Sequence, residues 1–97
     1  MSNIIKIKLE GSLTEAHGNP YGLNVYSTQI KNLFKETELN EIVFPNQIEE
    51  VSASFVQGLC SELKEKYGRK DIYNHIVLRS CHKELEKRIN DYIDITW

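Results

Sequence analysis

Residues 49–60 read EEVSASFVQGLC, and they mark the point at which the chain leaves a short apolar strand and enters a helix. From Phe55 onward, apolar residues recur every three to four positions with polar residues between them, which is the period of an amphipathic helix. Ser54 followed by Gln57 fits a capping box, in which the serine hydroxyl accepts a backbone N–H at the helix start. Gly68 supplies the residue that ends the helix.

Two serines, Ser52 and Ser54, lie at the start of this helix. The free N–H groups and the dipole of a helix favour negative charge at this end. A phosphate on either serine would add about −1.5 to −2 charges there, so both serines are candidates for phosphorylation or for contact with a partner. The alternative is that both hydroxyls only cap the helix, which is the commoner role and contributes about 1 kcal/mol each at most.

The rest of the chain alternates between strand and helix patterns, which is typical of an α/β domain with a mixed, mostly parallel sheet of about three or four strands and about three helices. The expected strands are at 4–9, 41–44 and 75–79, with a short strand at 12–16 that pairs back on the first. The expected helices are at about 23–36, which Asn19-Pro20 or Asn24 could start, and from 85 onward. Residues 17–22 are expected to form a loop, and residues 69–74 a polar connection.

The strands differ in their patterns. Residues 4–9 alternate between apolar and polar, which predicts one wet face near a sheet edge. Residues 41–44 (EIVF) form a continuous apolar run after Glu41. This run predicts a central strand that is covered on both faces or hidden beneath helices. Trp97 is expected either to cover the core or to form an exposed contact.

Composition favours one domain that spans residues 1–97. The net charge of −2 argues against a general nucleic-acid binder, which would need a basic face. No apolar run approaches the roughly 20 residues of a membrane span, and no signal peptide is expected before the first strand. Cys60 and Cys81 have no metal-ligand spacing, so a reduced, cytoplasmic setting is expected.

A parallel sheet gathers the loops that follow its strands at one edge, where ligands usually bind. The sequence therefore predicts a shared edge formed by His17, Asn19, Asn46, Ser52, Ser54, Arg79, Ser80, Cys81 and His82. Neighbouring side chains such as Cys81 and His82 diverge, and no nucleophile elbow, H-E-x-x-H pair or P-loop is present. No catalytic residue, metal or cofactor is therefore expected.

The central stretch also resembles a known family signature. Residues 51–55 (VSASF), with IVF at 42–44 before them and Gly68 after them, are similar to the pattern of a bacterial STAS-like family of unknown function. That family reads as a strand, then I-S-S-S-F-A-D-E-L, then a helix that ends in glycine. The similarity extends over residues 25–93, and Ala53 stands where the family usually has a serine.

The resemblance implies a small STAS-like domain. STAS domains, which include anti-sigma factor antagonists, carry D-S-S-G at the same turn, where a partner kinase phosphorylates a serine. Ser54 matches that position best and Ser52 is second. The implied function is a non-enzymatic regulatory module that binds a protein, such as a kinase-like ATPase.

Two alternatives stay open. One is a small inhibitor or assembly protein of phage or mobile-element origin that binds a protein partner without phosphorylation. The other is a small enzyme or nucleotide-binding domain that uses the loop edge. Neither nucleic acid nor a membrane is expected as a partner, and the sequence leaves the oligomeric state open.

Overall fold

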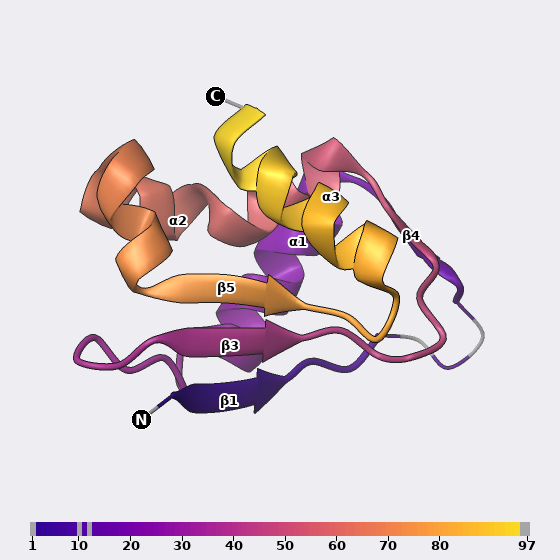
Figure 1. Ribbon diagram of the computed structural model, residues 1–97, viewed down its shortest axis with the longest axis horizontal. Coiled ribbons are helices and arrows are strands. Elements are labelled where there is room, and N and C mark those ends of the chain that lie inside the picture. The colour runs from indigo at the N-terminus through magenta and orange to yellow at the C-terminus, as the bar shows by residue number, and fades with distance from the viewer. Residues whose placement is uncertain (1, 10, 12, 96–97) are drawn as a thin grey trace.

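Two small parallel sheets organise the computed structural model, which describes residues 2–9, 11 and 13–95 (Figure 1). The larger sheet has three strands in the order β1-β3-β5, and the smaller sheet pairs β2 with β4. The strands are β1 (Asn3–Lys6), β2 (Glu15–Ala16), β3 (Asn40–Val43), β4 (Glu50–Val51) and β5 (Ile76–Arg79). The pairings of these strands are parallel in both sheets.

Helices connect β2 to β3 and β4 to β5, and they return the chain in the direction that parallel pairing requires. The helical elements are α1 (Asn19–Val25), the π-helical turn η1 (Tyr26–Ile30), α2 (Ala53–Asp71), the 3₁₀ turn η2 (Ile72–Asn74) and α3 (Lys83–Ile95). The predicted α/β fold, with a mostly parallel sheet and about three helices, is confirmed.

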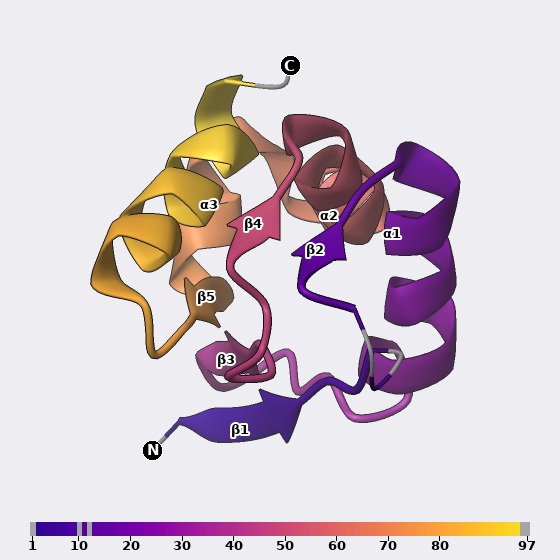
Figure 2. The ribbon, with the colours of Figure 1, turned by 90° about the vertical axis from the view of Figure 1, so that its right-hand side faces the viewer.

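The three-stranded sheet buries one of its faces. Along β3, Ile42 is fully buried whereas Glu41 and Val43 are partly exposed, because successive side chains point to opposite faces. Figure 2 shows this sheet nearly edge-on, with α1 and α2 on one side and α3 beside β5. As predicted, β1 lies at an edge and β3 in the centre. The prediction that β3 is covered on both faces or hidden beneath helices is wrong for one face, because Glu41 and Val43 are partly exposed there.

The core lies between this buried face and the helices. Its largest fully buried side chains are Phe44, Phe55, Ile5, Ile30, Ile42, Ile48, Leu59, Leu63, Ile72, Ile76, Leu78 and Ile89. In the described part of the chain, no helix is both long and apolar enough to cross a membrane.

The first helix lies nearer the N-terminus than the predicted range 23–36. It begins at Asn19, and Pro20 suits this start because proline is tolerated in the first helical turn. The prediction counted Leu23 and Leu33 as parts of an apolar face, but these side chains are 42% and 58% exposed. The apolar spacing therefore misplaced the end of the helix, whereas its start agrees with Asn19-Pro20, one of the two starts that the sequence offers.

Two glycines bring α1 and α2 into backbone contact. A Cβ at Gly22 would lie 2.2 Å from the carbonyl oxygen of Phe55, and a Cβ at Gly58 would lie 2.2 Å from that of Asn19. Only glycine fits at such a distance, so the two helices touch where neither has a side chain. This contact explains why part of the segment 17–22, which the sequence predicts to be a loop, is helical.

The second strand pairs differently from the prediction. Glu15 and Ala16 do not pair back on the first strand; they pair with β4 in a separate sheet, and Ser52 N extends the ladder by donating to Ala16 O at 2.9 Å. Ala16 and Val51 are both buried, so parallel pairing places both side chains in the core. Residue 12 of the predicted strand lies outside the described residues.

The end of α2 is also more regular than predicted. Gly68 interrupts the helix with φ = 84°, as predicted for its end, but the helix resumes as far as Asp71. The predicted polar connection at 69–74 is therefore mostly helical, and it buries Ile72 completely. Trp97 lies outside the described residues.

Candidate functional site

The strands β2 and β4 run side by side, and each leads into a helix. β2 precedes α1, and β4 precedes α2, so the starts of the two helices are neighbours (Figure 2). A hydrogen bond joins them, because Gly18 N donates to the Ser52 hydroxyl oxygen at 3.2 Å. This junction contains both serines that the sequence singled out.

Ser52 is the residue that caps α2. Its backbone is extended, with φ = −77° and ψ = 155°, and its hydroxyl oxygen accepts a hydrogen bond from Phe55 N at 3.1 Å. The predicted capping box of Ser54 and Gln57 is therefore wrong, because α2 begins at Ala53, immediately after Ser52. The Ser52 hydroxyl satisfies one helix N–H and one N–H from the other chain segment, which is a structural role.

Ser54 differs from Ser52 in its exposure. It is exposed in the first turn of α2, and its hydroxyl oxygen lies 3.1 Å from that of Ser52. His17 and Asn19 belong to the same junction: His17 is exposed and pairs with Glu15 at 2.7 Å, and Asn19 begins α1. Of the two candidate serines, Ser54 is exposed and Ser52 is only partly exposed.

We expect Ser52→Ala to lower the free energy of unfolding by about 1–2 kcal/mol, because two backbone N–H groups lose their acceptor. Urea denaturation measures this change. Ser54→Ala is the matched control and should change the stability by less than about 0.5 kcal/mol, since its hydroxyl accepts no backbone N–H from the described residues. Equal effects of the two substitutions would contradict the assignment of Ser52 as the cap.

The remaining predicted site residues lie where β3 and β5 end. The side-chain nitrogen Nε2 of His82 is 2.9 Å from the Asn46 carbonyl oxygen, and the Cys81 sulfur is 3.9 Å from the same oxygen. Ser80 accepts a hydrogen bond from His82 N at 3.1 Å, and Arg79 donates to Glu41 at 3.0 Å. The predicted residues therefore do not share one edge. They form two groups, one at the start of α1 and α2 and one at the ends of β3 and β5, because the strands that lead to the two groups belong to two sheets.

The contacts that the structure shows among these groups are hydrogen bonds and ion pairs. Among the described residues, no group of three or more His, Cys, Asp and Glu side chains is placed to hold a metal ion. Cys81 is exposed, whereas burial raises the pKa of the Cys60 thiol to about 12. Cys60 is therefore protonated at neutral pH and serves as an apolar side chain of the core.

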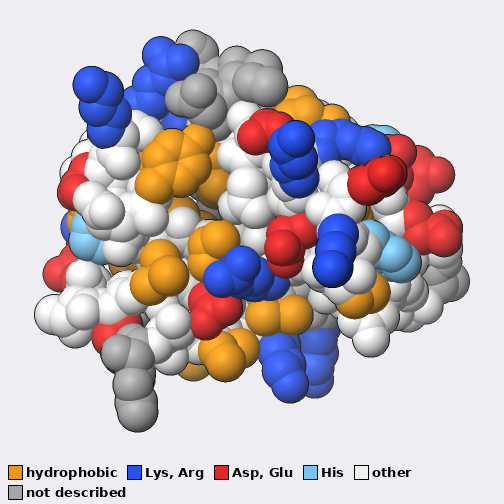
Figure 3. All heavy atoms as spheres, viewed as in Figure 1, with side chains coloured by type: hydrophobic (Ala, Val, Ile, Leu, Met, Phe, Trp, Pro, Cys, Tyr) orange, Lys and Arg blue, Asp and Glu red, His pale blue; other side chains and the backbone are white. Residues whose placement is uncertain are grey.

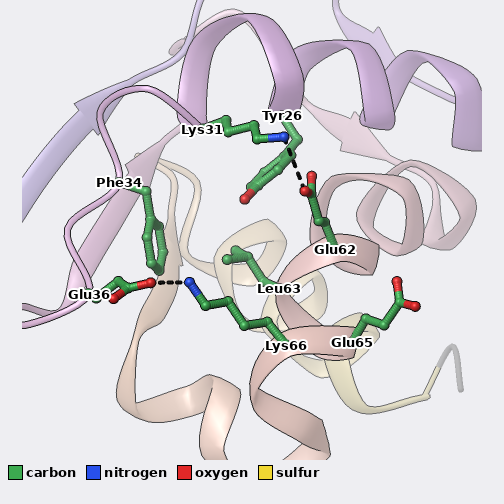
Figure 4. A pocket seen from close by; sticks show the side chains of 8 residues that line it. All are labelled: Tyr26, Lys31, Phe34, Glu36, Glu62, Leu63, Glu65 and Lys66. Carbon is green, nitrogen blue, oxygen red and sulfur yellow. Dashed lines mark hydrogen bonds and ion pairs between the residues drawn. The ribbon is translucent and has the colours of Figure 1, made fainter.

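Reasoning from the sequence missed a pocket of about 550 Å³ between α2 and the segment that follows η1 (Figure 4). It is lined by Tyr26, Lys31, Phe34, Glu36, Glu62, Leu63, Glu65 and Lys66. Two ion pairs join the two segments, Lys31 with Glu62 at 3.2 Å and Lys66 with Glu36. In the sequence, the charged residues of each segment are typical of the solvent-exposed face of a helix. Their pattern therefore does not predict ion pairs between the two segments.

Tyr26 gives this pocket its polar wall. Its side chain is nearly buried, and its hydroxyl points into the pocket in Figure 4. Burial raises the pKa of this hydroxyl, and the charge of Glu62 adds to the effect, so it stays a neutral hydrogen-bonding group. The pocket offers a hydroxyl and charges of both signs, which suit binding rather than nucleophilic chemistry.

Comparison with protein-family models, with curated proteins and with solved structures finds no match for this chain. The resemblance of residues 51–55 to the STAS-like pattern therefore stays a prediction.

Proposed function

We propose that this chain is a non-enzymatic regulatory module that binds another protein, and that Ser54 is its switch. The observation that carries the proposal is the exposed hydroxyl of Ser54 in the first turn of a 19-residue helix. Backbone N–H groups and the helix dipole favour negative charge at this end, so a phosphate is stabilised there. Ser52 is the weaker candidate, because its hydroxyl oxygen already accepts two backbone N–H groups.

The partner we propose is a protein with a kinase or ATPase fold, as the resemblance to STAS domains implies. A phosphate on Ser54 would bring about −1.5 to −2 charges to a surface that the partner contacts, and would change the affinity through electrostatics alone. The two free thiols, Cys60 and Cys81, support a cytoplasmic setting for this interaction.

The first test is phosphorylation. The purified protein is incubated with ATP and a kinase-fold protein from the same genome, and the product is analysed by mass spectrometry. We expect one phosphate on Ser54, which Ser54→Ala abolishes and Ser52→Ala retains. The absence of phosphate on both serines would rule out the switch.

Binding provides an independent readout of the same proposal. Calorimetry compares Ser54→Glu, which carries the charge, with Ser54→Gln, which has nearly the same size and no charge. We expect the Kd for the kinase-fold protein to differ about tenfold between them, as is usual for regulatory coupling. Identical affinities would show that charge at this position has no regulatory effect.

A second candidate function is a small inhibitor or assembly protein that binds without phosphorylation. One feature favours it: the three-stranded sheet exposes apolar side chains on the face that α1 and α2 leave uncovered. A partner bound equally by the wild type and by the Ser52→Ala/Ser54→Ala double variant would favour this function over the switch.

A further inference from the structure

The second face of the three-stranded sheet is uncovered by the described part of the chain. We call it the open face, and it consists of Ile4, Lys6, Glu41, Val43, Val77 and Arg79. Ile4 is 60% exposed, and Val43 and Val77 are partly exposed. Figure 3 looks onto this face and shows hydrophobic side chains among charges of both signs.

An uncovered face is unusual for this kind of sheet. Parallel sheets occur almost only where both faces are covered, because their strands carry apolar residues on both sides. The open face follows this pattern, since each of its three strands contributes one aliphatic side chain to it. The sheet is therefore built like one that a further layer covers.

The register of the strands arranges the six side chains in two rows. Ile4, Glu41 and Val77 lie side by side in the first row, and Lys6, Val43 and Arg79 in the second. The first row is thus apolar–acidic–apolar, and the second is basic–apolar–basic. Within one chain, Arg79 already pairs with Glu41 at 3.0 Å.

This pattern is complementary to itself. A twofold axis in the plane of the face, perpendicular to the strands, stacks the first row of one copy on the second row of another. Glu41 of each copy then lies over Val43 of the other, between its Lys6 and Arg79. The aliphatic stems of Lys6 and Arg79 cover the apolar side chains at the two ends of the first row.

The other in-plane twofold axis, parallel to the strands, gives the opposite result. It stacks Glu41 on Glu41 and Lys6 on Arg79, and like charges that face each other across an interface are strongly unfavourable. The charges therefore select one stacking direction, with the strands of the two copies antiparallel.

We propose that a second copy of this chain covers the open face in this antiparallel arrangement. A hollow of about 430 Å³ at the end of the second row, lined in part by Lys6, Val43 and Pro45, extends the surface available to the second copy. A standard interface has about 20–30 residues a side, many more than the six of the open face, so we expect a weak and reversible dimer. The proposal is independent of Ser54.

Sedimentation velocity over a broad range of protein concentration tests it. We expect the wild type to change from one copy to two as the concentration rises, and Ser54→Ala to do the same. Glu41→Lys should weaken dimerisation at least about tenfold, because it places a third cation between the Lys6 and Arg79 of the second copy. Glu65→Lys, the same charge change at an exposed position of α2, is the control and should leave the dimer unchanged.

A charge exchange makes the test specific to this face. The Lys6→Glu/Arg79→Glu variant should also be monomeric alone, but its mixture with Glu41→Lys should form a dimer. Ile4→Lys, at an exposed edge position where folding is unaffected, should weaken the wild-type dimer as well, because the new lysine faces Lys6 of the second copy. Circular dichroism verifies that each variant is folded.

The contrary outcomes are equally specific. A wild type that stays monomeric at every concentration overturns the proposal, including the case in which a different protein binds the face. A dimer that Glu41→Lys and Ile4→Lys both leave intact also overturns it, because the copies then meet elsewhere.

Discussion

Replacing Gly58 by alanine is expected to lower the free energy of unfolding by about 3 kcal/mol. The new methyl group would lie 2.2 Å from the carbonyl oxygen of Asn19, and a backbone atom at a helix start has little freedom to move away. Alanine is the better helix former by about 1 kcal/mol, but this gain is smaller than the cost of separating α1 from α2. Urea denaturation followed by circular dichroism measures the change.

Gly11→Ala is the matched control for this experiment. A Cβ there meets nothing within 4 Å, so the stability should change by less than about 0.5 kcal/mol. Gly22→Ala should resemble Gly58→Ala, because both glycines belong to one crossing. The double variant should cost less than the sum of the two, since the first substitution already separates the helices. A stable Gly58→Ala protein would mean that the helices do not cross at these positions.

Replacing Asn40 by alanine is expected to cost about 3 kcal/mol as well. Asn40 is fully buried at the start of β3. Its side-chain oxygen accepts from Asn3 Nδ2 at 2.8 Å and from Lys35 N at 2.9 Å, and its nitrogen donates to the carbonyl oxygens of Lys35 and His75 at 2.8 and 2.9 Å. The substitution removes the side-chain hydrogen bonds that join three chain segments at a fully buried position.

Asn40→Asp separates the two halves of this network. The aspartate side chain can still accept hydrogen bonds, but it can no longer donate to the carbonyl oxygens. It also buries a charge, so the substitution should be at least as destabilising as alanine. Asn32→Ala, at an exposed position, is the control and should leave the stability nearly unchanged. Denaturation curves of the three variants, compared with the wild type, measure these differences. An Asn40→Ala protein as stable as the control would contradict the role of this network.

Much of the fold was predictable because its long elements carry strong periodic patterns. The central strand at 41–44 and the helix that follows Ser52 were recognised from apolar residues whose spacing matches one type of structure. The sequence leaves the start of α1 open between Asn19-Pro20 and Asn24, because Pro20 and Gly22 are also typical of turns. The contact of Gly22 with α2 favours the earlier start. The pairing of β2 was predicted wrongly, because a strand of two residues is too short to show an alternation of apolar and polar side chains.

The candidate site was only partly predictable. Residues 49–60 identified the turn into α2 and its two serines, but the choice of Ser52 over Ser54 as the cap depends partly on Gly18, which lies far away in the sequence. The open face was hidden for a related reason. Apolar residues on both sides of a strand predict a covered strand, and the sequence does not say whether the cover belongs to the same chain.

The parallel pairing of all the described strands has a consequence for folding kinetics. Each pair joins segments separated by a complete helical connection, such as Asn3 with Asn40 and Glu15 with Glu50. Contacts of this kind form only after a long loop has lost its entropy, which slows folding relative to a helical bundle of the same length. During that delay the apolar strand edges are accessible to other chains, so the yield of refolding should fall as the protein concentration rises.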